Sequence, residues 1–195
     1  MTGKEAQTIS YYDNNAEVFT NSSINANMTA TCDEFLGYLQ PNSHILDLGC
    51  GTGRDSRYFI AHGHSVLPVD GSAEMCRIAT EVSGVTAKQM LFQELNFTEE
   101  FDGVWACASL LHAERNQLPT ILQKISVALK DGGILYMSFK YGIGDKERSG
   151  RFFSDMTEDD IPFLCDGYKV IRTFITEDVR ADHKGERWLN IFVKK

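Results

Sequence analysis

The stretch at residues 45–60, ILDLGCGTGRDSRYFI, passes abruptly from an apolar pattern to a glycine-rich one and then to a helical one. An apolar run that carries Asp47 leads into Gly49, Gly51 and Gly53, and a helix-like pattern follows. Glycine lets a backbone approach a neighbour without interference from a Cβ atom, and a helix that starts there presents its positive end to the same place. We therefore predict a strand, a turn and a helix, with ligand binding at the turn favoured over a purely structural role.

Strand-like and helix-like segments alternate from residue 42 onward. Strands are expected at residues 43–49, 64–70, 85–91, 101–108 and 134–140, and helices at 54–63, 72–84 and 116–130. Such alternation is typical of right-handed βαβ units in a parallel sheet that is covered on both faces. After a polar loop and a short helix at 157–165, two last strands at 168–179 and 187–195 should pair antiparallel, because the link between them is short.

The predicted fold class is therefore α/β: a Rossmann-like, doubly wound sheet of seven strands, mostly parallel with an antiparallel final strand, and helices on both faces. The chain has 195 residues, which suits one domain with a sizeable core. We expect a helical lid region at residues 1–40, with helices near 11–19 and 28–40, and a core at 41–195.

Composition disfavours several functional classes. A formal net charge of −8 argues against a nucleic-acid binder, which normally carries a basic stripe. We find no apolar run long enough to span a membrane, and the N-terminus lacks the apolar core of a signal peptide. The five cysteines are odd in number and form no C-x-x-C pair, which indicates reduced thiols, a cytoplasmic location and no metal site.

The identity of the ligand can be narrowed from the loop itself. A dinucleotide fingerprint would place a glycine where Arg54 stands, and the loop lacks the G-K-[ST] of a phosphate-binding Walker A motif. Asp70 closes the second predicted strand about twenty residues further on, where a carboxylate can accept hydrogen bonds from ribose hydroxyls. The alternative is that Asp70 only caps the next helix. A nucleoside-containing ligand is the favoured interpretation.

Four segments together, ILDLGCGTGRDS, VLPVDGSAEM, FDGVWACASLLH and LKDGGILYMSFK, resemble the successive motifs of class I S-adenosylmethionine-dependent methyltransferases. The resemblance covers residues 10–195, and the small single-domain form is similar to tellurite-resistance-type methyltransferases. It implies S-adenosylmethionine as cofactor and S-adenosylhomocysteine as product. It also implies a set of cofactor-binding positions: Asp47, Gly49, Cys50, Gly51, Gly53, Asp70, Gly71, Ser72, Met75, Leu91, Phe92, Ala106, Cys107 and Ala108.

One position departs from the family pattern. Family members usually supply a carboxylate to the adenine amino group after the third strand, and Met90 stands there in this chain. Backbone groups of Leu91 or Phe92 could read the adenine edge instead, and Gln93 or Glu94 could take the side-chain role.

Methyl transfer is an in-line displacement that depends mainly on alignment and on exclusion of water, so a catalytic residue is not required. His112 and Tyr12 are candidates for a base or a substrate contact, with a structural histidine and a packing tyrosine as the alternatives. The absence of a proline before Cys107 argues against covalent cytosine chemistry, and Cys107 is interpreted as a small buried residue.

Acceptor binding is expected from the loop at residues 140–155 and from the lid, with a solvated surface loop as the alternative. The candidate residues are Tyr11, Lys140, Tyr141, Arg148 and Arg151, which would suit an anionic, partly planar acceptor. The chain holds little beyond the core, so we expect a small-molecule acceptor and neither a nucleic acid nor a membrane as partner. The alternatives are a non-catalytic cofactor-binding protein or partner subunit, or a protein or tellurite-like acceptor; a monomer and a homodimer both stay open.

Overall fold

A seven-stranded sheet forms the centre of the computed structural model, which describes residues 2–180 and 183–195. The strands lie in the order β3-β2-β1-β4-β5-β9-β8, and β9 pairs antiparallel with both of its neighbours while the other pairs in the sheet are parallel. This confirms the predicted fold class. The strand bounds are β1 His44–Leu48, β2 Ser65–Asp70, β3 Lys88–Gln89, β4 Phe101–Ala106, β5 Leu129–Lys140, β8 Lys169–Glu177 and β9 Arg187–Lys194.

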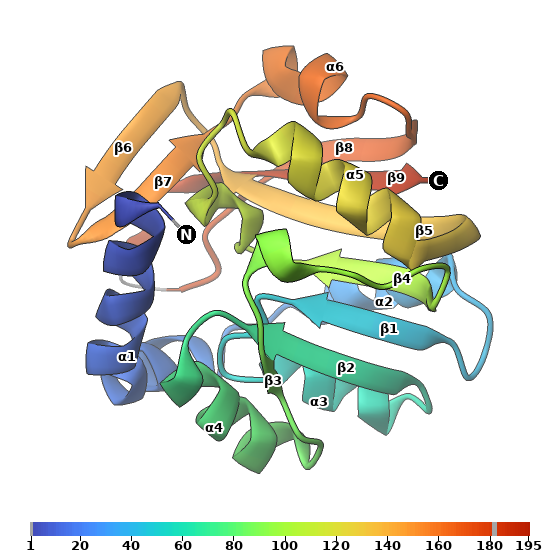
Figure 1. Ribbon diagram of the computed structural model, residues 1–195, viewed down its shortest axis with the longest axis horizontal. Helices are drawn as coiled ribbons and strands as arrows, with labels where there is room; N and C mark the ends of the chain where they lie inside the picture. Colours follow the sequence, from blue (N-terminus) through green and yellow to red (C-terminus); the bar gives the residue numbers. More distant parts are fainter. Residues whose placement is uncertain (1, 181–182) are drawn as a thin grey trace.

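Helices connect the strands and cover the sheet on its two faces (Figure 1). Their bounds are α1 Gly3–Ser23, α2 Thr29–Gly37, α3 Arg54–Ala61, α4 Ala73–Ser83, α5 Leu118–Ala128 and α6 Ile161–Leu164. Short 3-10 turns, η1 Phe92–Glu94, η2 Leu110–His112 and η3 Glu158–Asp160, follow strand ends or precede α6. None of the described helices is long and apolar enough to cross a membrane.

Successive side chains of the central strands point to opposite faces of the sheet and pack into two separate apolar layers. Leu46, Val104 and Leu135 pack toward the layer that contains α5, whereas Ile45 and Trp105 pack toward the layer that contains α2 and α3. All five side chains are fully buried. The strands between these layers are therefore held rigidly, and their carboxyl ends are fixed in relation to one another.

Three local predictions were wrong in detail. The third strand is only Lys88–Gln89, because the chain leaves the sheet edge at Met90 and turns into η1. The helix expected at residues 116–130 ends at Ala128, and β5 already begins at Leu129. The predicted loop at 140–155 contains a two-stranded hairpin, β6 Gly144–Arg148 and β7 Arg151–Asp155, whose turn uses the left-handed residues Ser149 and Gly150.

Of the two N-terminal helices, α1 lies over the carboxyl ends of the strands, where a lid was expected, whereas α2 packs against a face of the sheet in the same layer as α3. Figure 1 shows α1 beside the β6–β7 hairpin at one end of the sheet, with α4 on its other side. Asp13 of α1 accepts hydrogen bonds from the Ser72 hydroxyl at 2.6 Å and from the Glu74 amide at 3.3 Å, while Thr8 accepts one from the Phe152 amide at 3.0 Å. Helix α1 thus joins the hairpin to the start of α4.

Candidate active site

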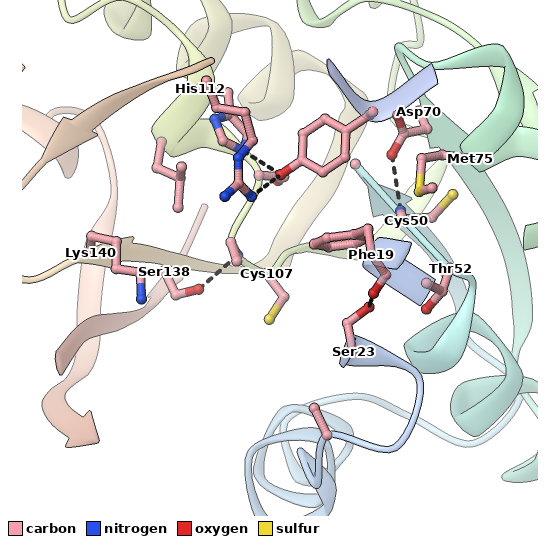
Figure 2. A pocket seen from close by; sticks show the side chains of 18 of the residues that line it. Phe19, Ser23, Cys50, Thr52, Asp70, Met75, Cys107, His112, Ser138 and Lys140 are labelled. Atoms are coloured by element: carbon pink, nitrogen blue, oxygen red, sulfur yellow. Dashed lines mark hydrogen bonds between the residues drawn. The ribbon is translucent and has the colours of Figure 1, made fainter. Parts of the chain in front are cut away.

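A cavity of about 470 Å³ lies at the carboxyl ends of β1, β2, β4 and β5, beneath α1. Figure 2 shows its two ends: Asp70, Cys50 and Met75 lie at one, and His112 and Lys140 lie at the other. Phe19 of α1 projects between them, and Cys107 lies near the middle of the floor. In open α/β sheets this edge is where ligands bind.

The three loop glycines all have positive φ angles, but for different reasons. A Cβ on Gly49 would lie 2.3 Å from the Ser109 Cβ, and one on Gly53 would lie 2.8 Å from the Ala79 Cα, so close packing within the protein requires both glycines. A Cβ on Gly51 would meet only the Phe19 ring, at 3.7 Å, and would project toward the cavity. Gly51 is therefore the glycine that most directly leaves room for a ligand.

The loop amides are largely used to hold the loop itself. The amides of Gly49 and Cys50 both donate to the Val69 carbonyl, at 2.8 and 2.9 Å, and the Gly51 amide donates to Asp70 Oδ2 at 2.9 Å. These three amides are therefore not free to donate to a ligand, and the loop would contribute to ligand binding mainly through its shape.

Asp70 has a structural role beside the start of α4, although Ser72 is the residue that caps this helix, and ribose binding by Asp70 stays a prediction. Its Oδ1 accepts the Ser72 amide at 2.9 Å and its Oδ2 accepts the Gly51 amide, so it fixes the start of the α4 segment and the loop. A carboxylate has about four acceptor positions, so two hydroxyls could still donate to it. Burial raises the pKa of Asp70, and the backbone hydrogen bonds from Ser72 and Gly51 oppose that rise.

Asp47, at the end of β1, lies deeper than Asp70. Its Oδ2 accepts the Ser56 hydroxyl at 2.5 Å. Burial, together with the neighbouring Asp55 carboxylate, raises the pKa of Asp47 to about 7, although the hydrogen bond from Ser56 opposes this shift. A cationic ligand group beside Asp47 would favour its charged form, as the ammonium of the methionine part of a cofactor would do.

The end of the cavity beyond Asp70 is apolar and is lined by Met90, Leu91 and Phe92. Glu94 accepts the Leu91 amide at 2.8 Å within η1. Neither Glu94 nor Gln93 lines the cavity, so no acidic side chain replaces the family's adenine-binding carboxylate at these two positions.

At the other end, His112 and Tyr12 form a hydrogen-bonded pair. His112 Nδ1 lies 2.6 Å from the Phe152 carbonyl, which can only accept, so Nδ1 carries the proton and Nε2 accepts the Tyr12 hydroxyl at 2.9 Å. Burial, reinforced by the charge of Arg151, lowers the pKa of His112 to about 4. His112 is thus a neutral hydrogen-bonding group and a weak base.

Most cations around this end are neutralised by carboxylates. Arg148 donates to both oxygens of the buried Asp155, and Lys140 donates to Asp178 and Glu186. Burial opposes the ionisation of Asp178, but the hydrogen bonds from Arg180, Lys140 and Trp188 outweigh it and hold the pKa of Asp178 well below its usual range.

The structure brings most of the predicted site residues to this one cavity. Those that line it are Tyr12, Asp47, Gly49, Cys50, Gly51, Asp70, Gly71, Ser72, Met75, Leu91, Phe92, Cys107, Ala108, His112, Lys140, Arg148 and Arg151. Gly53, Ala106, Tyr11 and Tyr141 lie outside it. Gly53 caps α3 and Ala106 is fully buried; the Tyr141 hydroxyl donates to Glu158, and Tyr11 lies under the Arg151 guanidinium.

Several lining residues had not been selected from the sequence, among them Phe19 and Ser138. Ser138 Oγ accepts the Ala108 amide at 2.8 Å and so holds Ala108 at a φ of 52°, which is uncommon for a residue with a side chain. No local pattern marks such a residue. Phe19 could have been found from its spacing of seven residues to Tyr12, which places both on one face of α1.

Comparison with known families identifies the domain. Residues 45–133, from β1 to the turn inside β5, match the family model described as "Methyltransferase domain". The matched segment is slightly less than half of the chain, and it supports the assignment to the class I S-adenosylmethionine-dependent methyltransferases. The cofactor of this family, S-adenosylmethionine, agrees with the resemblance found in the sequence motifs.

One curated protein with a similar sequence is the carboxy-S-adenosyl-L-methionine synthase of Aliivibrio fischeri, which is 29% identical over 143 residues, covering 63% of this chain and 54% of the relative. The chain spans about half the length of the curated relatives it matches. The match therefore supports the family and not a particular reaction.

Two solved structures show how widely the fold is shared. The 1,6-didemethyltoxoflavin-N1-methyltransferase of Burkholderia thailandensis, solved with 1,6-didemethyltoxoflavin and S-adenosylhomocysteine, superposes with a TM-score of 0.78 at 22% identity, covering 98% of this chain and 86% of that one. TehB of Haemophilus influenzae superposes with a TM-score of 0.73 at 15% identity, covering 92% and 66%. At these identities the likeness concerns the fold alone.

Proposed function

We propose that this protein transfers the methyl group of S-adenosylmethionine to a small-molecule acceptor bound in the same cavity. The observation that carries the proposal is the continuity of the cavity, which runs from Asp70 and the glycine loop to His112 and Arg151 under one lid helix. A protein that only binds the cofactor has no need of the second end.

The residues present suit the cofactor chemically. The open cradle at Gly51 leaves room for it, Asp70 would accept ribose hydroxyls, and Asp47 would face the ammonium of the methionine part. Met75 and Leu91 offer apolar surface for the adenine. The cofactor supplies an electrophilic methyl group on a sulfonium, which the nucleophilic atom of an acceptor displaces in line.

The chain itself would contribute to catalysis by aligning the methyl donor with the acceptor and by excluding water from the cavity. Cys107 lies in the floor between the two ends, and burial raises the pKa of its thiol to about 12, so it stays protonated and would serve as neutral packing. The Tyr12 oxygen, held in place by the hydrogen bond to His112, would accept a hydrogen bond from the acceptor. Because the pKa of His112 is about 4, it suits positioning better than proton removal, and the proposal requires no general base.

Binding is tested by thermal unfolding with S-adenosylhomocysteine, S-adenosylmethionine and NAD in parallel. A ligand at about 100 times its dissociation constant raises the free energy of unfolding by roughly 2.7 kcal/mol. For a domain of this size, each kcal/mol raises the thermal unfolding midpoint by about 2–4 °C. We expect the rise with the two adenosyl ligands and not with NAD. Absence of a rise with either adenosyl ligand contradicts the proposal.

Catalysis is tested by incubating the protein with S-adenosylmethionine and small-molecule acceptors and measuring S-adenosylhomocysteine. We expect its release to depend on one acceptor class. Tight cofactor binding without turnover across small-molecule, protein and tellurite-like acceptors favours a non-catalytic cofactor-binding protein instead.

A further inference from the structure

Arg151, the first residue of β7, differs from the other cations that line the cavity. Arg54, Arg148 and Lys140 each donate to a carboxylate, whereas within residues 2–180 and 183–195 no ion pair is formed by Arg151. Its Nη1 reaches only the Tyr12 hydroxyl, at the long distance of 3.5 Å. Its Nε is buried and has no hydrogen-bond partner.

Aromatic rings hold this guanidinium in place. Its Cζ lies 4.5 Å from the centre of the Tyr11 ring, 5.3 Å from that of Phe153 and 5.7 Å from that of Tyr12. Such contacts orient the planar group and contribute some stability, but the ring faces take up none of its five N–H donors. The group is therefore positioned while its donors stay largely unused.

An unneutralised cation in a part-buried cavity is unfavourable unless something compensates it. Guanidinium has the fork geometry that binds carboxylates and other oxyanions through two parallel hydrogen bonds. Arg151 is also adjacent to the Tyr12–His112 pair. Figure 2 shows His112 at the end of the cavity opposite Asp70. The missing counter-charge is thus on the acceptor side of the cavity.

Resting on the proposed function, we propose that Arg151 is the anion-binding residue of the acceptor site, and that the acceptor is a small molecule carrying a carboxylate or another oxyanion. The rings of Tyr12 and Phe153 provide apolar faces beside this group, so the remainder of the acceptor has a planar or apolar part. His112 uses both ring nitrogens within the protein and holds the Tyr12 hydroxyl, whose oxygen can accept a further hydrogen bond from the acceptor.

The oxyanion that Arg151 binds could also belong to the cofactor, whose methionine part carries a carboxylate. We favour the acceptor because Arg151 comes from the hairpin, whereas the residues suited to the methionine part, Asp47 and Gly51, surround the loop after β1. The experiment below separates these two sources.

The probe is the midpoint shift of the full chain, saturated with S-adenosylhomocysteine and held at constant ionic strength, on addition of acetate, benzoate or phosphate. Acetamide and benzamide serve as neutral counterparts. We expect at least one anion, and neither amide, to raise the midpoint by about 2–4 °C at several times its dissociation constant. Arg151→Met should abolish this difference, and Arg151→Lys should retain part of it.

Lys4→Met is the matched control. Lys4 of α1 lies 4.6 Å from the Phe152 ring, so it forms the same kind of contact between lid and hairpin, but it does not line the cavity. The control should keep the anion effect. A persistent anion effect in Arg151→Met, an equal loss in Lys4→Met, or no anion effect in the natural protein overturns the proposal.

The affinities for S-adenosylhomocysteine and for 5′-methylthioadenosine, which lacks the carboxylate, complete the test. Arg151→Met should leave both unchanged. A selective loss of S-adenosylhomocysteine affinity would show that Arg151 binds the cofactor's carboxylate and would overturn the acceptor role. Failure of the natural protein to bind S-adenosylhomocysteine at all would instead contradict the proposed function.

Discussion

At the scale of single residues, the two ends of the cavity are built from groups that already serve the fold. Asp70 accepts hydrogen bonds from the glycine loop and from the start of the α4 segment. Gly49 has no Cβ, which leaves space for Ser109 to pack beside it. The Ser109 hydroxyl in turn donates to the Leu48 carbonyl at 2.6 Å. Ligand binding and local packing are therefore coupled at the same positions, and substitutions there should be compared with carefully matched controls.

Asp70→Ala should weaken S-adenosylhomocysteine binding by roughly 1–3 kcal/mol, because hydrogen bonds from the ribose hydroxyls to a charged acceptor are lost. Isothermal titration calorimetry measures this directly. Asp131→Ala, at an exposed position near the start of β5, removes the same charge away from the cavity lining and should change nothing. Unchanged affinity in Asp70→Ala would remove Asp70 from the site.

Gly49→Ala should destabilise the protein by more than about 2 kcal/mol, since the added Cβ lies 2.3 Å from the Ser109 Cβ in a left-handed backbone conformation. Gly63→Ala is the control: its φ is also positive, at 86°, but the added Cβ meets open space. It should cost only about 1–2 kcal/mol of backbone strain. Urea unfolding of both variants checks this, and equal losses would contradict it.

The pKa of His112 gives a prediction about pH. Its folded-state pKa of about 4 lies below the value of 6.5 for the free side chain, so the unfolded chain binds more protons between these values. The stability contributed by neutral His112 is present above pH 6.5 and is lost as the pH falls toward 4. His112→Asn should reduce the loss between pH 7.5 and 4.5 by up to about 2–3 kcal/mol.

Urea unfolding at the two pH values measures this, with the exposed histidine variant His62→Asn as control. Only the difference between variants is informative, because Asp47, whose pKa is raised to about 7, acts in the opposite direction over the same range. An identical pH dependence in all three proteins would contradict the assignment of a neutral His112.

At the scale of elements, helix α1 and the β6–β7 hairpin cover the sheet edge and form walls of the cavity. Helix α1 contacts α4 through Asp13 and the hairpin through Thr8, and its backbone departs from helical geometry at Asn15. The sequence predicted a lid from the helix-like segments near residues 11–19 and 28–40 and from the lack of any strand signal before residue 41. It did not predict the hairpin, because the strands pair through a turn whose left-handed Ser149 has no distinctive residue type.

Ligand binding should order α1 more than any helix that lies away from the cavity. Hydrogen–deuterium exchange measured by mass spectrometry should show slower exchange of Gly3–Ser23 when S-adenosylhomocysteine is present, because the cofactor adds contacts beneath it. Leu118–Ala128, which packs in the core on the sheet's face, serves as the internal control. Equal protection of both helices, or none in α1, would contradict the role of a lid.

At the scale of the whole molecule, most of the fold could be predicted because a parallel sheet has a strong and regular signal. Buried strands such as Leu46 to Leu48 and amphipathic helices alternate, and the glycine loop fixes which edge binds ligand. The end of the cavity around His112 and Arg151 was only partly predictable. Which of its cations is unpaired depends on partners distant in sequence, such as Lys140 with Asp178, and these emerge only when the chain is folded.

The central claim is that one cavity holds the cofactor at the glycine loop and leaves the end around His112 and Arg151 for an acceptor. A crystal structure of the protein with S-adenosylhomocysteine tests this most directly. The account predicts the ribose hydroxyls within hydrogen-bond distance of Asp70 and the sulfur atom facing the open space toward His112. Adenine bound beside His112 and Arg151, or a ribose distant from Asp70, would contradict it.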